Sequence, residues 1–214
     1  MRVISGSARG RKLKSPKTSE TRPIMDRVKT ALFDILAPEI LGMRVLDLFA
    51  GVGSVGIEAL SRGAASATFV ERSPEAFRLV RENLALTNLS DRAEVLRTDA
   101  FAYLQQAAAS GRRFDLVYVA PPQYEGLARQ ALAQLDAAPL TEPDGLVIVQ
   151  IHPQERGEVD TLPLKRLRRY DERKYGSTLL LFYSDDSDDS DVIDDEEPKE
   201  SEESHATDAT DATR

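Results

Sequence analysis

The sequence contains no cysteine, no tryptophan and only 2 histidines. The absence of cysteine excludes a disulfide framework, and with so few imidazoles and no thiolate we expect no zinc site or other metal centre. No apolar run reaches the length of about 18 residues that a membrane-spanning helix needs, and no apolar stretch follows a basic start as in a secretory signal. The 214 residues are therefore expected to form one cytoplasmic domain with extensions and no membrane partner.

Charge is distributed unevenly, and the formal net charge of −8 conceals three different regions. Residues 1–30 hold 9 basic and 2 acidic side chains, residues 31–183 hold 17 and 20, and residues 184–214 hold 2 and 14. We therefore predict a basic N-terminal arm or small hairpin over 1–22 and a folded domain over 23–183. The region 184–214 has almost no apolar side chains to bury, so it is predicted to be a disordered acidic tail.

Between the charged ends, short apolar runs alternate with segments of helical periodicity, the pattern of a doubly wound, mostly parallel α/β sheet. The predicted parallel strands cover 45–49, 67–70, 93–97, 116–119 and 146–151. The predicted helices cover 26–36, 54–62, 74–87, 100–109 and 124–137. Two further strands, 162–169 and 178–183, are joined around Tyr175 and Gly176 and are expected to pair antiparallel at one edge.

A glycine turn follows the first predicted strand, with Asp47 before it and Gly51, Gly53 and Gly56 within it. Gly51 and Gly53 allow a tight turn and close approach of a ligand to the backbone, and Ser54 is expected to cap the next helix. The G-x-G-x-x-G spacing is that of dinucleotide-binding folds, so a nicotinamide-dependent reductase is one interpretation. Asp47 would repel a pyrophosphate but attract an ammonium and a sulfonium, which favours S-adenosylmethionine. The alternative is a carboxylate that only caps the helix or ties the loop.

Two more acidic residues follow the second and third predicted strands. Glu71 ends the second strand, where a carboxylate can accept hydrogen bonds from both hydroxyls of a ribose. Asp99 follows the third strand, close enough to accept a hydrogen bond from an adenine amino group. The alternative is that Asp99 only caps the N-terminus of the following helix. The predicted cofactor-binding residues are Asp47, Phe49, Gly51, Gly53, Ser54, Glu71, Arg72, Asp99 and Ala100.

The fourth predicted strand ends in two consecutive prolines. These cannot continue a strand ladder and would fix a stiff turn beside the methyl donor. Gln123 or Tyr124 could occupy the space where a base would stack. The candidate catalytic segment consists of Ala120, Pro121, Pro122, Gln123 and Tyr124.

The basic N-terminal region combines arginine and lysine with glycine and serine, a composition suited to phosphate. Within it, Val3 and Ile4 are expected to pair with Leu13 as a small hairpin. The alternative to nucleic-acid binding is a merely solvated terminus, but the position directly upstream of a methyl-donor site favours RNA. The predicted RNA-binding residues are Arg9, Arg11, Lys12, Arg22 and Arg27.

Residues 47–53, with the Pro-Pro turn after the fourth strand, resemble the class I S-adenosylmethionine-dependent methyltransferases. Segments 4–13, 21–33, 59–64, 69–71 and 173–178 resemble a narrower family, the bacterial small-subunit ribosomal RNA guanine-N2 methyltransferases. This resemblance covers about residues 1–183. It implies a seven-stranded sheet with the last strand antiparallel and a guanine in a ribosomal RNA hairpin loop as the substrate. It also implies S-adenosylmethionine across Gly51 and Gly53, with Glu71 on its ribose and Asp99 near its adenine.

The turn departs from that family's usual pattern, in which Asn or Asp precedes Pro-Pro and an aromatic residue follows. Ala120 and Gln123 occupy those positions here. The guanine amino nitrogen needs acceptors on its N–H groups, and Ala120 removes one while the Pro121 carbonyl remains. The predicted function is guanine-N2 methylation by a monomer, on free ribosomal RNA or a partly assembled small subunit. A methyltransferase of another RNA or DNA base, and a non-catalytic RNA-binding relative that retains the cofactor pocket, are the alternatives.

Overall fold

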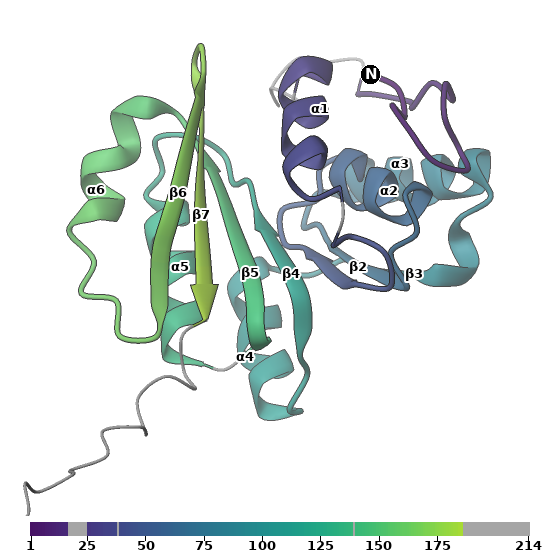
Figure 1. Cartoon of the computed structure of the whole chain (residues 1–214). Helices are drawn as coiled ribbons and strands as arrows, with labels where there is room; N and C mark the ends of the chain where they lie inside the picture. The colour runs from purple at the N-terminus through teal and green to yellow at the C-terminus, as the bar shows by residue number, and fades with distance from the viewer. Residues whose placement is uncertain (17–24, 38, 139, 186–214) are drawn as a thin grey trace, which may run out of the picture.

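The computed structural model describes residues 1–16, 25–37, 39–138 and 140–185. They contain a seven-stranded sheet in the order β3-β2-β1-β4-β5-β7-β6 (Figure 1). Neighbours from β3 to β5 are parallel, and β7 is antiparallel to both β5 and β6. The predicted doubly wound, mostly parallel α/β fold is confirmed. The strands are β1 (Arg44–Asp47), β2 (Ser66–Val70), β3 (Ala93–Leu96), β4 (Phe114–Val119), β5 (Thr141–Ile151), β6 (Leu167–Tyr175) and β7 (Thr178–Asp185).

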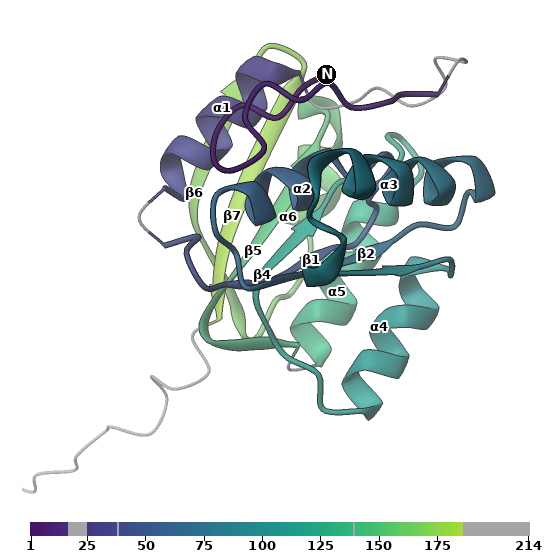
Figure 2. The ribbon, with the colours of Figure 1, turned by 90° about the vertical axis from the view of Figure 1, so that its right-hand side faces the viewer.

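Helices cover both faces of the sheet (Figure 2). Val45 and Leu116 belong to the apolar core shared with α1, α2 and α3, whereas Leu46 and Val117 face the core shared with α4, α5 and α6. Successive strand residues point to opposite faces, so burial on both sides explains the nearly continuous apolar runs. Within the described ranges, no helix is long and apolar enough to span a membrane. The helices are α1 (Asp26–Ile35), α2 (Ser54–Ser61), α3 (Pro74–Thr87), α4 (Ala100–Ala109), α5 (Leu127–Ala137) and α6 (Arg156–Asp160).

The parallel pairing brings the carboxyl ends of β1, β2 and β4 to one edge of the sheet, here called the carboxyl edge. Backbone bonds continue past the ends of the strands, from Leu48 N to Tyr118 O and from Ala50 N to Val70 O, both at 3.0 Å. The loops after these strands therefore start side by side. In doubly wound sheets ligands bind at such an edge.

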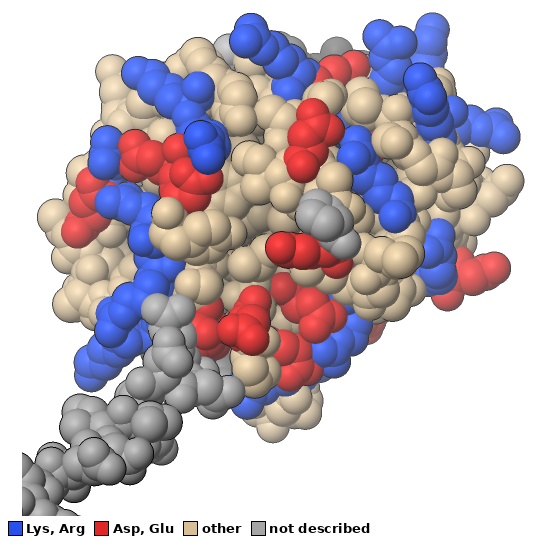
Figure 3. Space-filling model, viewed as in Figure 1, with Lys and Arg blue, Asp and Glu red and all other residues tan. Residues whose placement is uncertain are grey.

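The N-terminal segment, residues 1–16, folds back on itself and packs on α2 and α3 (Figure 1). Arg2 and Lys12 form an antiparallel bridge. Gly6 lies so close to α2 that a Cβ there would come within 1.8 Å of the Ser61 carbonyl oxygen. Figure 3 shows Lys and Arg side chains gathered at the upper right, over the region where Figure 1 draws this segment. The apolar side chains that it adds to the core are Val3, Ala8 and Leu13.

The predicted helix over 124–137 begins later than expected, at Leu127. Tyr124 and Gly126 have φ values of 64° and 67°, left-handed conformations that an α-helix does not include. Gly126 is the N-cap of α5. The helical periodicity of the sequence could not reveal a turn enforced by the residues that precede the helix.

The predicted strand over 162–169 was wrong, because β6 spans Leu167–Tyr175 and follows the unpredicted helix α6. The carboxylate of Asp136, on α5, accepts hydrogen bonds from the backbone N–H groups of Lys165, Arg166 and Leu167 at 2.8 to 3.0 Å. These backbone N–H groups donate to a side chain, so they are not used for hydrogen bonds to a neighbouring strand. The loop therefore persists until Leu167.

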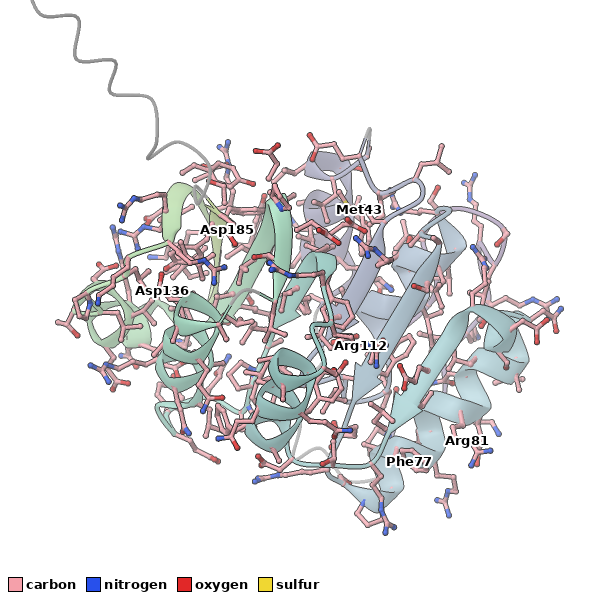
Figure 4. The ribbon with its side chains drawn as sticks, turned by 90° about the horizontal axis from the view of Figure 1, so that it is seen from below. Met43, Phe77, Arg81, Arg112, Asp136 and Asp185 are labelled. Carbon is pink, nitrogen blue, oxygen red and sulfur yellow. The ribbon has the colours of Figure 1, made fainter. Side chains whose placement is uncertain are left out.

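The strand β7 ends at Asp185, beyond the predicted end of the folded domain at 183. Asp185 is 5% exposed, and its carboxylate accepts a hydrogen bond from the Thr141 hydroxyl at 2.6 Å and pairs with Arg166. It lies at the same end of the molecule as Asp136 (Figure 4). The expectation that the tail begins at 184 is corrected accordingly, since charge pattern alone does not distinguish a buried, paired aspartate from a solvated one. The rest of the predicted tail lies outside the described residues.

Candidate cofactor and substrate site

The glycine turn after β1 lies at the centre of the carboxyl edge. Gly51 and Gly53 have φ values of 55° and 79°, which favour glycine. A Cβ on Gly51 would meet no atom within 4 Å, so the turn faces open space there. A Cβ on Gly53 would lie 3.2 Å from the side chains of Ile57 and Val80. Gly53 thus serves close packing, and Gly51 leaves room for a ligand against the backbone.

Asp47, the last residue of β1, is 2% exposed. Its Oδ2 accepts a hydrogen bond from Gly56 N in the first turn of α2 at 3.0 Å. Burial raises the pKa of Asp47 to about 7; the Gly56 N–H opposes this rise, and the neighbouring Glu71 carboxylate adds to it. The loop-tying role that the sequence left as an alternative is therefore present. A cation bound over the turn would favour the ionised form of this carboxylate.

Glu71, directly after β2, reaches across to the glycine turn. Its Oε2 accepts from Gly51 N at 2.8 Å, and its Oε1 accepts from Ser73 N at 2.7 Å. A carboxylate oxygen has more than one lone pair, so these bonds leave acceptor capacity for the hydroxyls of a ribose. Arg72, the next residue, is exposed.

Asp99 is the N-cap of α4, as the alternative interpretation stated. Its Oδ1 accepts from Phe101 N and Ala102 N at 2.9 and 3.1 Å. Asp99 is exposed, whereas Ala100 is buried. Sequence reasoning missed Phe101, whose ring packs edge-on against Phe49 with centroids 6.1 Å apart. This aromatic pair joins the loop after β1 to the first turn of α4 at the carboxyl edge. Its signal in the sequence is an aromatic residue shortly after the capping acid.

Ser54 does not cap α2, contrary to the sequence prediction. Gly53 is the N-cap, and the Ser54 hydroxyl instead accepts a hydrogen bond from Lys29 Nζ at 3.4 Å. Lys29 Nζ also donates to the Arg2 carbonyl at 2.6 Å and lies 3.3 Å from Glu58 Oε2. One buried ammonium therefore joins α1, α2 and the N-terminal segment directly behind the glycine turn.

Glu58 is the centre of this buried charged cluster. Besides Lys29, its carboxylate accepts from Ile4 N at 2.8 Å, from Ser5 N at 2.9 Å and from Arg62 Nε at 2.9 Å. The side chains of Lys29 and Glu58 are both 0% exposed. Burial lowers the pKa of Lys29, and the Glu58 carboxylate opposes the shift. Sequence reasoning missed this cluster because charged residues of an amphipathic helix are normally assigned to its solvent face.

Buried Asn83 of α3 connects the N-terminal segment to the glycine turn. Its Nδ2 donates to the carbonyls of Val52 and Lys14 at 3.0 and 3.1 Å, and its Oδ1 accepts from Lys14 N at 2.7 Å. Val52 stands between Gly51 and Gly53 in the turn. The basic segment and the turn therefore cannot separate without breaking buried hydrogen bonds.

The basic side chains beside the turn point to solvent. Arg9, Arg11 and Lys12 are exposed, as is Arg27 at the start of α1. Arg22 lies outside the described residues. The structure thus places four of the five predicted RNA-binding residues on the surface and fixes the segment that carries three of them beside the glycine turn.

The Pro-Pro turn follows β4, whose parallel partner is β1. Pro121 is buried and Pro122 exposed, whereas Ala120 and Gln123 are half-buried. Tyr124 is 62% exposed, a large fraction for an aromatic side chain beside a candidate site. The predicted catalytic segment and the glycine turn are therefore neighbours at the carboxyl edge.

Two hollows, of about 370 and 350 Å³, lie at the opposite edge of the sheet. Arg112 lines the first and Met43 the second, and both are labelled in Figure 4. An ion pair between Arg44 and Asp115 at 3.0 Å crosses the same edge. No predicted cofactor-binding or catalytic residue lines either hollow, so the carboxyl edge remains the candidate site.

The sheet order, an acidic residue before a glycine turn and a second acidic residue after β2 define a class I S-adenosylmethionine-dependent methyltransferase. S-adenosylmethionine is the cofactor of this class. Carboxylates at Asp47 and Glu71 and the open side of Gly51 fit a cationic ligand that carries a ribose. A nicotinamide-dependent reductase is not supported, because a pyrophosphate would face the Asp47 carboxylate.

Comparisons with known proteins agree with this class. A family model described as "Conserved hypothetical protein 95" matches residues 1–184, and the chain belongs to that family. The putative rRNA methyltransferase YlbH of Bacillus subtilis is 41% identical over 155 residues, which are 72% of this chain and 84% of the relative. Ribosomal RNA small subunit methyltransferase D of Escherichia coli is 37% identical over 150 residues, 70% of this chain and 74% of the relative.

Among solved structures, the putative methyltransferase yhhF from Escherichia coli matches with a TM-score of 0.74 and 33% identity, over 86% of this chain and 97% of that one. The hypothetical protein TTHA0928 of Thermus matches with a TM-score of 0.71 and 36% identity, over 85% of this chain and 98% of that one. These relatives confirm the family resemblance that the sequence motifs indicated.

Replacing Glu71 with alanine is expected to weaken S-adenosylmethionine binding by roughly 1.5 to 3 kcal/mol, because a charged acceptor for the ribose hydroxyls is lost. Glu71→Gln keeps one carbonyl acceptor, so its affinity for S-adenosylmethionine should lie between those of Glu71→Ala and the wild type. Glu75→Ala removes an exposed carboxylate in the first turn of α3 and serves as the control. Calorimetric titration measures the affinities, and an unchanged value for Glu71→Ala would remove this residue from the site.

Proposed function

We propose that the protein transfers a methyl group from S-adenosylmethionine to the exocyclic N2 amine of a guanine in small-subunit ribosomal RNA. The main structural support for an RNA substrate is the pair of hydrogen bonds from Asn83 to the Lys14 and Val52 carbonyls. These bonds fix a segment with exposed basic side chains beside the glycine turn. RNA held there by its phosphates would present a nucleotide to the carboxyl edge. The names of the Bacillus subtilis and Escherichia coli relatives support ribosomal RNA as the substrate.

In this proposal S-adenosylmethionine lies across Gly51 and Gly53, with Glu71 on its ribose, Asp99 near its adenine and Asp47 as a counter-charge. Phe49, Ser54, Arg72 and Ala100 border the same site. The phosphates of the RNA bind Arg9, Arg11, Lys12, Arg22 and Arg27. We further propose that the protein acts in the cytoplasm as a monomer, on ribosomal RNA that is free or in a partly assembled small subunit.

The proposed chemistry depends on hydrogen-bond acceptors rather than on a strong base. The lone pair of the guanine amine is delocalised into the ring, so an acceptor on the N–H draws electron density onto nitrogen as it attacks. When bound, the cofactor supplies a methyl group activated by the positive sulfur. The Pro121 carbonyl, directed by the stiff Pro-Pro turn, is the proposed acceptor, because Ala120 has no polar side-chain atom. The methylated amine is acidic and loses its proton to water.

The substitution Ala120→Asn is expected to preserve or raise the rate of methyl transfer, because the amide oxygen adds a second acceptor. Pro121→Ala should slow transfer by roughly tenfold or more while RNA affinity falls less, since the interaction is made mainly in the transition state. Single-turnover transfer of labelled methyl groups to ribosomal RNA measures the rates, and mass spectrometry of the nucleosides identifies the methylated atom.

The control for these variants is Pro143→Ala, an exposed proline at the opposite edge of the sheet. If the wild type transfers no methyl group while Ala120→Asn does, the natural protein is an RNA-binding relative that has lost catalysis. A methylated nucleoside other than N2-methylguanosine would establish a different base. If neither protein transfers a methyl group, the guanine assignment is wrong.

A further inference from the structure

Tyr124 and His152 bring two rings together next to the Pro-Pro turn. Their ring centroids are 5.3 Å apart, and their planes are tilted by 48°. Tyr124 belongs to the loop after β4, and His152 follows β5 directly, so both emerge at the carboxyl edge from neighbouring parallel strands. Tyr124 is 62% exposed, which leaves most of its surface free for another planar group.

The side chain of Glu155 holds the backbones of both ring-bearing residues. Its Oε1 accepts from Tyr124 N at 2.8 Å, and its Oε2 accepts from His152 N at 2.9 Å. Glu155 is 5% exposed, so these charge-assisted bonds form away from water. Gln154 N also donates to His152 Nδ1 at 3.2 Å, which orients the imidazole. One buried carboxylate thereby fixes two loops relative to each other.

The backbone of Tyr124 has a φ of 64°, an uncommon conformation for a residue other than glycine. Such a conformation costs free energy and persists only where the surroundings enforce it. Here this conformation holds the Tyr124 ring largely in solvent. The ring therefore packs against little of the protein and contributes little to the stability of the fold. The strained backbone, the buried carboxylate and the exposed ring together indicate a surface that is built to bind.

We propose that Tyr124 and His152 form a stacking platform for the nucleobase that is turned out of the RNA, and that Glu155 is the positioning residue of this platform. The inference rests on the proposed function and specifies how its substrate base is held. Aromatic side chains stack on the flat face of an unpaired base, and this stacking depends little on which base it is. The platform supplies the aromatic surface that Gln123, directly after the Pro-Pro turn, does not.

The test compares Tyr124→Ala and His152→Ala with two controls in the full chain. Tyr124→Phe keeps the ring, and Tyr170→Ala removes another tyrosine, 54% exposed, from the edge strand β6. The first measurement is the emission of 2-aminopurine in the loop of an RNA hairpin, at saturating protein with S-adenosylhomocysteine, because stacking on a ring quenches this emission. The second is single-turnover methyl transfer to ribosomal RNA.

Tyr124→Ala is expected to lose the quenching and to slow methyl transfer by roughly ten- to a hundredfold, with a smaller loss for His152→Ala. Both should bind the cofactor as the wild type does. Tyr124→Phe should keep the quenching, because the ring is retained, and Tyr170→Ala should leave both the quenching and the methyl transfer unaltered. Glu155→Gln replaces one acceptor oxygen by an amide nitrogen, so it should lose part of the quenching while RNA affinity and the thermal midpoint remain close to those of the wild type.

Quenching and transfer rates that stay unaltered in Tyr124→Ala and His152→Ala would overturn the platform, and so would a wild type that does not quench. Methyl transfer by the wild type would in that case leave the proposed function standing. Conversely, a wild type that methylates no ribosomal RNA counts against the proposed function, while the emission measurement still decides whether the platform binds a base.

Discussion

Replacing Glu58 with alanine is expected to lower the free energy of unfolding by about 3 to 5 kcal/mol, because the change leaves a buried ammonium without its carboxylate. The same carboxylate accepts from Ile4 N and Ser5 N, so the N-terminal segment loses two of its anchoring bonds as well. Urea unfolding followed by circular dichroism measures the effect, provided that the m value is unchanged. Hydrogen exchange over residues 3–8 should accelerate in parallel.

The matched variant is Lys29→Met. Without Lys29, the Glu58 carboxylate still has Arg62 Nε at 2.9 Å and the two backbone donors, so the expected cost is smaller, about 1 to 2 kcal/mol. The double variant Lys29→Met/Glu58→Ala should cost less than the sum of the two single changes, since the residues are in direct contact. Equal costs for the two single variants, or strict additivity, would mean that the cluster is not organised around Glu58.

The affinity for S-adenosylmethionine is expected to rise roughly 20- to 30-fold between pH 5.5 and 7.5. Burial and the neighbouring Glu71 carboxylate raise the pKa of Asp47 to about 7 in the cofactor-free protein. A cation bound over the glycine turn favours the ionised carboxylate, so below that pKa binding must displace a proton. The α-amino group of the cofactor remains mostly protonated in this range, because its ordinary pKa is about 8. Calorimetric titration at several pH values measures the trend.

The same carboxylate should give the opposite trend in the stability of the cofactor-free protein. The pKa of Asp47 is about 7 in the folded state, against an ordinary value of 3.8, so the folded state binds more protons between these limits. The free energy of unfolding therefore falls as the pH rises through this window, by about 4 kcal/mol in all. Asp47→Asn keeps an acceptor for the Gly56 N–H and should flatten both trends. If the affinity or the free energy of unfolding still depends on pH in this variant, a titratable group other than Asp47 is responsible.

Local patterns in the sequence were sufficient for the central sheet and the glycine turn. Val45, Leu46 and Leu116 lie in runs that must be buried on both faces, and only a sheet covered by helices on both sides provides that. The glycines of the turn and the acids at or just after the carboxyl ends of β1, β2 and β3 follow from the same strand assignments. The parallel order of β1, β2 and β4 then brings these residues to one edge without any further specific contact.

The parts that could not be predicted depend on pairings between distant residues. Glu58 carries no local signal of burial, because its partners come from the N-terminal segment and from α1. The turn at Tyr124 depends on Glu155, which lies 31 positions further along the chain. Asp185 was assigned to the acidic tail because its immediate neighbours are acidic, whereas Thr141 and Arg166 bury it. A single sequence contains the side chains of such pairs but not their proximity.

The position of Asp185 determines the side of the molecule on which the chain continues. Because β7 runs antiparallel to β5, its last residue pairs with Leu167 at the start of β6 and bonds to Thr141 at the start of β5. These positions lie at the edge of the sheet opposite the glycine turn. A fluorophore or surface linker joined immediately after residue 185 would therefore begin on the far side from the proposed cofactor site. The enzyme could thus be tethered to a glass surface with the glycine turn and the proposed cofactor site facing the solution, which suits single-molecule recordings of RNA arrival and departure.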